Sequence, residues 1–227
     1  MAKAKVVVSL LSKDQEFQLM QASDAERAAA KAGLELEIVF AKNNSTLQLE
    51  QLYRFVHAPT TSRPAAIIAQ TVGGDGLPRV ARDAVKAGIG WILLSRDVPY
   101  IDQLRSENPK LPIAVVTTDQ IEIGRIQGRQ LRSLLPSGGH VVYVQGPPDT
   151  SAAAGRLKGA QEILAGSGVE LHIINGEWTA ASGEQAITSW LRLSSSQLQR
   201  SEAIAAQNDD MAMGVRKAIE TRKPDWS

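Results

Sequence analysis

The chain has 227 residues, 43% hydrophobic and 22% charged, which is typical of a folded globular protein and argues against a disordered one. Its 25 basic and 24 acidic residues nearly cancel, so we expect this chain to bind no nucleic acid. The absence of cysteine excludes disulfides, thiolate nucleophiles and Cys-ligated metals.

The first residues lead into a short apolar segment that lacks the features of a signal peptide. No apolar stretch approaches the ~18–20 residues that a membrane span requires. We therefore expect either a cytoplasmic chain or the mature form of an exported one, and the sequence does not separate the two.

In the first half of the chain, short apolar runs alternate with longer segments of helical period, as in successive βαβ units around a parallel sheet. Five strands complete a small doubly wound sheet, so we predict an α/β lobe over residues 1–118. The expected strands are 5–11, 35–40, 65–69, 91–95 and 113–117, and the expected helices are 16–32, 46–56 and 77–87.

The same pattern restarts after an extended segment at 117–119 and predicts a second α/β lobe over residues 119–227. A doubly wound sheet has ~5–6 strands, and only three are visible, so we expect this lobe to be incomplete at its C-terminus. The expected strands are 140–145, 170–174 and 203–206, and the expected helices are 121–135, 151–165, 182–193 and 211–220.

Ligands bind open parallel sheets just outside the carboxyl ends of the strands, so the segments that follow the strands hold the candidate contacts. These segments are polar, rich in amides and sparsely aromatic. Aromatic faces, amides, carboxylates and a guanidinium suit a polyhydroxylated ring. The candidates are Asp14, Phe17, Gln70, Ser95, Arg96, Asp119, Trp178 and Asn208.

Several of these candidates have a structural interpretation that the sequence leaves open. Trp178 could pack within its own lobe, and Arg96 could pair with the adjacent Asp97. We expect Asp209 to cap the helix that follows, which would leave Asn208 free for a ligand. Thr150 is expected to cap a helix as well, while Trp91 is expected to lie in the core of its sheet.

No pattern in the sequence indicates catalysis or a cofactor. The glycine-rich segment 73–76 lacks the Gly-Lys-Ser/Thr of a phosphate-binding loop and is expected to be a flexible turn. His57, His140 and His172 show no metal spacing and are interpreted as structural. With no nucleophile and base pair, no paired carboxylates and no metal cluster, we predict a protein that is not an enzyme and holds no metal.

Several motifs in chain order carry a resemblance to a known family. The most specific is AQNDDMAMG at 206–214, followed by VQG at 144–146, the segment TSAA at 150–153, Arg156 with Gly159, and Ser95-Arg96. On these motifs the chain resembles the type 1 periplasmic binding proteins of the ribose-binding kind. Their fold is shared by the effector domains of lac-repressor-type transcription regulators.

The resemblance implies ligand contacts from Phe17, Ser95, Arg96, Trp178 and Asn208. Sugar binders of this kind often have a carboxylate where this chain has Ser95, and often an arginine where it has Ala154. The ligand is therefore open among sugars, polyols and other small polar solutes.

The resemblance also implies a function. It is that of a periplasmic receptor that closes two lobes on a sugar or similar solute for uptake by an ABC-type transporter, with a membrane permease as partner. The alternative is a cytoplasmic effector domain of a LacI-type regulator, in which the same pocket accompanies a DNA-binding head.

Overall fold

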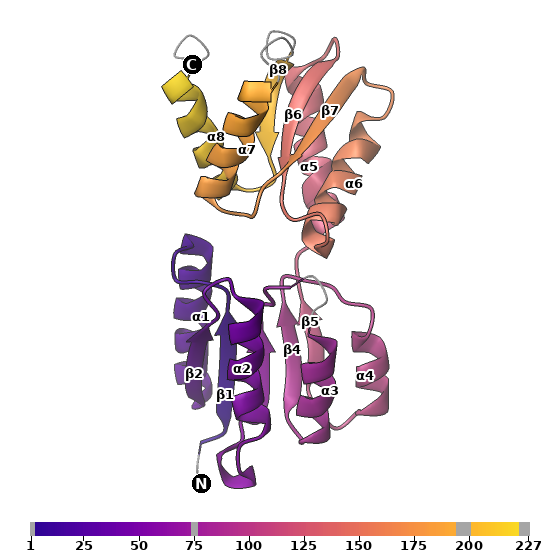
Figure 1. The fold of residues 1–227 in the computed structure, drawn as a ribbon. Coiled ribbons are helices and arrows are strands. Elements are labelled where there is room, and N and C mark those ends of the chain that lie inside the picture. The colour runs from indigo at the N-terminus through magenta and orange to yellow at the C-terminus, as the bar shows by residue number, and fades with distance from the viewer. Residues whose placement is uncertain (1–2, 74–76, 194–200, 223–227) are drawn as a thin grey trace. The chain divides into compact units, whose positions relative to one another are not determined.

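The structure is a computed structural model that describes residues 3–73, 77–193 and 201–222. The chain divides into two compact units, Met1–Thr118 and Asp119–Ser227, here called the first and the second lobe. Each lobe is built on its own parallel sheet with helices packed against it (Figure 1). The predicted α/β fold of two doubly wound lobes is confirmed.

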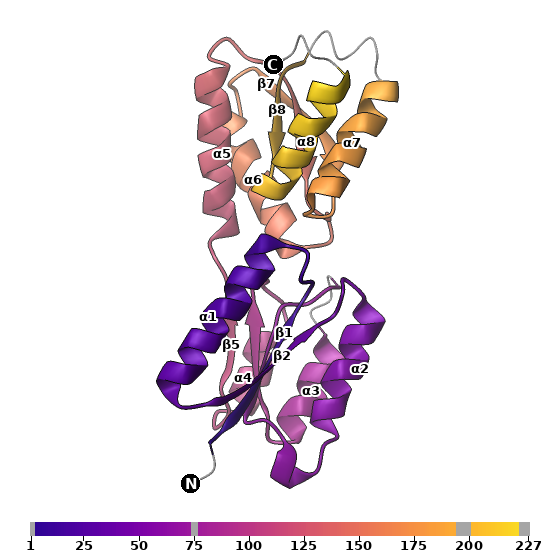
Figure 2. The same cartoon turned by 90° about the vertical axis from the view of Figure 1, so that its left-hand side faces the viewer.

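In the described part of the first lobe, five parallel strands form a sheet in the order β2-β1-β3-β4-β5. Helix α1 lies on one face of the sheet, and α2 and α3 lie on the other (Figure 2). The strands are β1 (Lys5–Leu10), β2 (Glu35–Phe40), β3 (Ala66–Ala69), β4 (Gly90–Leu94) and β5 (Ile113–Val116). The helices are α1 (Glu16–Ala32), α2 (Ser45–Val56), η1 (Thr60–Ser62), α3 (Pro78–Lys86) and α4 (Ile101–Glu107).

The core of this lobe follows from the alternation of side chains along its strands. Val7, Ile67, Trp91 and Ile113 lie in register across four neighbouring strands and belong to one buried cluster with α2 and α3. The expectation that Trp91 belongs to the core is confirmed, since its side chain is fully buried.

The second lobe has three parallel strands among its described residues, in the order β7-β6-β8. Alternate residues of β6 face two separate cores. Val141 and Tyr143 pack with the side of the lobe that carries α5 and α6, and Val142 and Val144 with the side that carries α7 and α8. The elements are α5 (Gln120–Leu134), β6 (Gly139–Gln145), α6 (Ser151–Leu164), β7 (Val169–Asn175), α7 (Ala180–Leu193), β8 (Ser201–Ala206) and α8 (Asp209–Arg222).

Every predicted strand and helix is found within two residues of its expected ends. The pattern did not predict α4, a helix of seven residues. Such a short helix is too weak to form by itself. It is stabilised by the burial of Ile101 and Leu104 in the core of the first lobe.

Glycines bring the helices of the second lobe into backbone contact. A Cβ atom added to Gly124 on α5 would lie 2.0 Å from the carbonyl oxygen of Arg156 on α6. In return, a Cβ atom on Gly159 would lie 1.9 Å from the carbonyl oxygen of Ile121. Any side chain at either glycine would therefore force the two helices apart.

Helices α7 and α8 show the same arrangement on the other side of the sheet. A Cβ atom on Gly183 would lie 2.3 Å from the carbonyl oxygen of Met211, and one on Gly214 would lie 1.8 Å from that of Ala180. Both helix pairs of this lobe are thus packed at distances that only glycine permits. No helix in the described residues is both long and apolar enough to cross a membrane.

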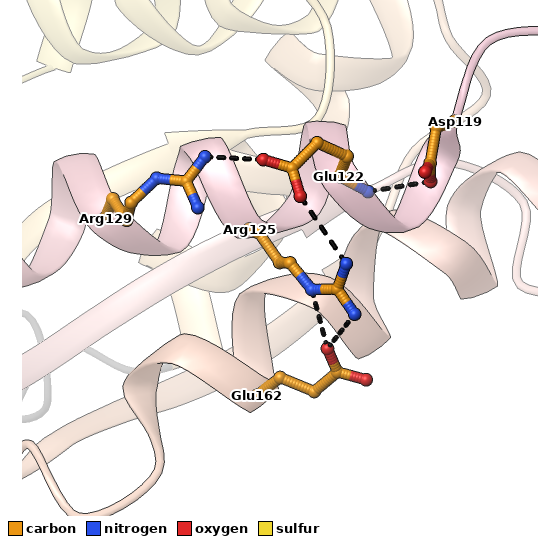
Figure 3. A network of polar contacts seen from close by, with 5 residues as sticks. All are labelled: Asp119, Glu122, Arg125, Arg129 and Glu162. Carbon is orange, nitrogen blue, oxygen red and sulfur yellow. Dashed lines mark hydrogen bonds and ion pairs between the residues drawn. The ribbon is translucent and has the colours of Figure 1, made fainter.

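An exposed network of charges joins α5 to α6 (Figure 3). The carboxylate of Glu122 accepts hydrogen bonds from Arg129, at 2.6 Å, and from Arg125, at 3.4 Å. Arg125 also donates to Glu162 on α6 at 2.9 Å. Asp119 caps the helix by accepting from the backbone N–H of Glu122 at 2.9 Å.

We expect Gly124→Ala to lower the free energy of unfolding by about 1–3 kcal/mol, because overpacking forces the helices apart. This effect opposes the roughly 1 kcal/mol that alanine gains over glycine inside a helix. Urea denaturation followed by circular dichroism measures the change. Ser133→Ala, at an exposed position of the same helix, is the control, and a Gly124→Ala protein as stable as the wild type would contradict the close contact.

The charge network predicts a stability that depends on pH. The hydrogen bond from Arg129 holds the pKa of Glu122 below its usual value of 4.5. A lowered pKa means that the stabilisation is present above the pKa of the unfolded chain and is lost as the pH falls through the folded value. The Tm advantage of the wild type over Glu122→Gln should therefore shrink progressively below pH 4.5.

Because the network is exposed, the same advantage should also shrink at neutral pH when salt is added. Glu26→Gln, which removes an exposed carboxylate from α1, is the matched control. An advantage of Glu122 that stays constant from pH 7 to well below 4.5 would show that the network does not stabilise the fold.

Candidate functional site

The strand ends of the first lobe are tied together by buried glutamines. Gln18 on α1 is only 1% exposed. Its Oε1 accepts from the backbone N–H of Leu11 at 2.9 Å, and its Nε2 donates to Oε1 of Gln70 at 2.8 Å. One side chain thus connects the segment after β1 to the segment after β3.

Gln48 on α2 makes the corresponding connection from the other side of the sheet. It is fully buried, and its Nε2 donates to the hydroxyl of Ser9 at 3.0 Å and to the carbonyl oxygen of Gln70 at 2.7 Å. Its Oε1 accepts from the backbone N–H of Val72 at 2.9 Å. Sequence reasoning missed both glutamines because each lies within a helix and not after a strand.

The predicted contacts after β1 are both exposed. Asp14 accepts a hydrogen bond from the hydroxyl of Ser12 at 2.7 Å, which shapes the turn into α1. Phe17 lies in the first turn of α1 and is 54% exposed, and Met20 one turn later is 61% exposed. An aromatic ring so accessible at a strand end is available to pack against a ligand.

The segments after β3 and β4 are linked to each other. The guanidinium of Arg96 donates to the carbonyl oxygen of Gly73, so it crosses from one strand end to the next. Ser95 has a left-handed backbone, with φ of 61°, and its N–H donates to the carbonyl oxygen of Val116 at 2.8 Å. The carboxylate of Asp97 accepts from the backbone N–H of Val98. Of the turn predicted at 73–76, residues 74–76 lie outside the described residues.

The structure therefore places five of the predicted contacts at the same edge of the first sheet, the edge where its parallel strands end. They are Asp14, Phe17, Gln70, Ser95 and Arg96. Asp119 belongs to the second lobe, and its carboxylate caps α5.

In the second lobe, Trp178 and Asn208 are in direct contact. The Nδ2 of Asn208 donates to the carbonyl oxygen of Trp178 at 3.0 Å, and its Oδ1 accepts from the backbone N–H of Met211 at 3.1 Å. Asn208 is thus the N-cap of α8, and the expectation that Asp209 holds this position is wrong. The helix already begins at Asp209, so the residue before it occupies the cap position.

Gln207 fixes the ends of β6 and β8 relative to α6. It is 1% exposed, its Oε1 accepts from the backbone N–H of Gly146 at 3.0 Å, and its Nε2 donates to the carbonyl oxygen of Ala153 at 3.0 Å. The sequence motif at 206–214 contains this residue, but spacing alone gave it no role. Thr150 caps α6 as predicted, by accepting from the N–H of Ala153 at 3.2 Å.

Arg156 on α6 reaches into the same region. Its Nε donates to Oε1 of Gln120 at 2.9 Å, and its Nη1 donates to the carbonyl oxygen of Gln207. Its guanidinium carbon lies 5.4 Å from the ring centroid of Trp178. Burial lowers the pKa of Arg156 from its usual value, and the Coulombic effects of Tyr143 and Asp209 oppose this shift.

The histidines lie apart from these strand ends. His57 caps the C-terminus of α2 and packs edge-on against Tyr53, and His140 lies 3.3 Å from a carboxylate oxygen of Glu170. His172 lies beside Trp190, with ring centroids 6.1 Å apart. Within the described ranges, no group of three or more acidic, histidine or cysteine side chains is placed to hold a metal ion.

The buried amides predict a stability effect. We expect Gln48→Met to lower the free energy of unfolding by about 1–3 kcal/mol, because it leaves the buried N–H of Val72 without its acceptor. Gln103→Met, at an exposed position of α4, is the control for the same chemical change. Equal urea midpoints for the two variants would show that the amide of Gln48 does not hold the strand ends.

A family model described as "Periplasmic binding protein domain" matches residues 6–225, nearly the whole chain. The chain belongs to this family. The resemblance noted from the strand-end motifs is thereby confirmed.

Curated relatives include the "Putative rhizopine-binding protein" of Rhizobium meliloti, 29% identical over 82% of this chain and 58% of that protein. The "HTH-type transcriptional regulator AscG" of Escherichia coli (strain K12) is 34% identical over 39% of this chain and 26% of the regulator. The chain thus spans less than two thirds of the length of either relative.

Solved structures agree on the fold. The crystal structure of a galactofuranose binding protein superposes with a TM-score of 0.83 at 23% identity and covers 96% of this chain. This chain covers 71% of that one. At this identity the likeness establishes the architecture alone.

Proposed function

We propose that this chain is the ligand-binding part of a receptor that closes two lobes on a small polyhydroxylated solute and does no chemistry on it. The observation that carries the proposal is membership of the periplasmic binding protein family over residues 6–225. Relatives named for binding small polar molecules support it.

The strand ends supply groups suited to such a ligand. In the first lobe, Phe17 offers an exposed aromatic face, and Arg96 and Gln70 offer planar donors and acceptors. In the second lobe, the half-buried Trp178 offers an aromatic face and the half-buried Asn208 a planar amide. Apolar C–H faces pack on aromatic rings while hydroxyls bond to amides and guanidinium groups.

Two of the proposed contacts, Asn208 and Asp119, also make hydrogen bonds within the protein. Asn208 uses both Nδ2 and Oδ1 of its amide for hydrogen bonds within its own lobe. It therefore contributes to ligand binding by holding the backbone of Trp178, and also through the second N–H of its amide. Asp119 is the helix cap of α5 and is proposed as a weaker candidate, because a capping carboxylate has fewer lone pairs left for a ligand.

By extension, we propose a periplasmic location and delivery of the ligand to the permease of an ABC-type importer. The alternative is the effector domain of a transcription regulator, favoured by the partial match to a helix-turn-helix regulator. Gene context separates the two. A neighbouring permease gene and an encoded leader support the receptor, and an in-frame helix-turn-helix supports the regulator.

Phe17 gives the sharpest test of the proposed site. In titration calorimetry of the purified full-length protein against aldopentoses, aldohexoses and cyclic polyols, we expect Phe17→Ala to weaken binding about tenfold or more. Loss of an aromatic face of this size removes roughly 1.5–3 kcal/mol of apolar burial. The melting temperature without ligand should change little, because the ring is 54% exposed.

Met20→Ala is the matched control, since Met20 lies on the same helix and is 61% exposed. It should bind the ligand as the wild type does. Equal losses in the two variants would place the ligand elsewhere, and no heat of binding from any of these solutes to the wild type would refute the proposed function.

A further inference from the structure

The position of the Trp178 ring depends on the absence of a side chain at Gly146. A Cβ atom on Gly146 would lie 2.1 Å from Cζ2 and 2.2 Å from Cε2 of Trp178. Gly146 directly follows β6, so the indole lies against the end of the central strand of its sheet. Only glycine lets the ring lie so close.

The backbone of Trp178 is also restrained by its neighbours. Its φ of 64° is left-handed, which few residues other than glycine adopt without support. The amide of Asn208 supplies that support through the carbonyl oxygen of Trp178, and the hydroxyl of Ser182 accepts from the N–H of Thr179 at 3.2 Å. The direction in which the indole leaves the chain is therefore set by two neighbouring segments.

Arg156 provides the remaining restraint on the ring. Its guanidinium lies 5.4 Å from the ring centroid, within the range of a cation–π contact. The same group is fixed by hydrogen bonds to Gln120 on α5 and to the carbonyl oxygen of Gln207 after β8. It is thus anchored to two other elements and does not move freely in solvent.

We infer that Arg156 is a positioning residue that sets the place of the Trp178 ring, and through it the ligand selectivity of the second lobe. This inference rests on the proposed function for its effect on ligands. A planar guanidinium can donate to two acceptors while it lies over a ring, whereas the compact ammonium of lysine cannot reproduce this arrangement. The bare Cα of Gly146 lets the ring lie against the end of β6, and Arg156 restrains the ring there.

The test is a double-mutant cycle of Arg156→Lys and Trp178→Leu, read as the ratio of the Kd values for a pentose and a hexose. Arg156→Lys should change this ratio by about 2-fold to 30-fold, the range of a cation–π contact. In the Trp178→Leu background the same substitution should leave the ratio unchanged. A change in ratio that persists without the indole would overturn the inference, as would no change in either background.

A second readout needs no ligand and separates this inference from the proposed function. The fluorescence of Trp178 is the part of the tryptophan signal that is lost in Trp178→Leu. Acrylamide should quench this part more strongly in Arg156→Lys than in the wild type, because the ring is no longer held. Gly146→Ala, which displaces the same ring, should have the same effect if it folds. Arg132→Lys, an exposed position of α5, is the control and should leave the quenching as in the wild type.

If the wild type binds no sugar but the quenching changes as expected, the proposed function fails and the positioning role stands. If the wild type binds sugars and neither the quenching nor the Kd ratio changes in Arg156→Lys, the positioning role fails alone.

Discussion

Backbone contact between α5 and α6 is the constraint on which the arrangement of Arg156 and Trp178 in the second lobe depends. Gly124 and Gly159 remove the side chains that would separate the two helices, so the carbonyl oxygen of each helix meets a bare Cα of the other. This close approach brings Arg156 within reach of Gln120 and, beyond it, of the segment after β8. A wider spacing of the helices would withdraw the guanidinium from the indole of Trp178.

In the first lobe, buried glutamines and not glycine contacts hold the strand ends in place. Its strand ends are joined by Gln18 and Gln48, whose amides each bond to two different segments of backbone or side chain. A buried amide leaves a costly unsatisfied group if either segment moves. The start of α1, which carries Phe17, and the segment that carries Gln70 are therefore held in place by side chains that take no part in the proposed ligand contacts.

Periodicity and composition were enough to predict the lobes, the strands that the described residues form in each and the segments that follow them. Apolar runs and glycine stops are local features, and they mark β1 to β8 within two residues. The buried role of Gln18 could not be predicted, since a glutamine on a helix is ordinarily exposed. The contact of Arg156 with Trp178 joins residues of different elements, which spacing alone does not reveal. The cap of α8 was misassigned because Asn208 and Asp209 are equally good caps, and only the start of the helix decides between them.

The three buried glutamines that hold the strand ends have one property in common, which is that their side chains carry no ionisable proton. The amides of Gln18, Gln48 and Gln207 donate and accept in the same way in acidic and neutral surroundings. The charge network around Glu122, by contrast, weakens as acidity rises. Acidification would thus weaken the ion pairs that Glu122 makes with Arg125 and Arg129 on α5, while the amide hydrogen bonds at the strand ends would stay as they are.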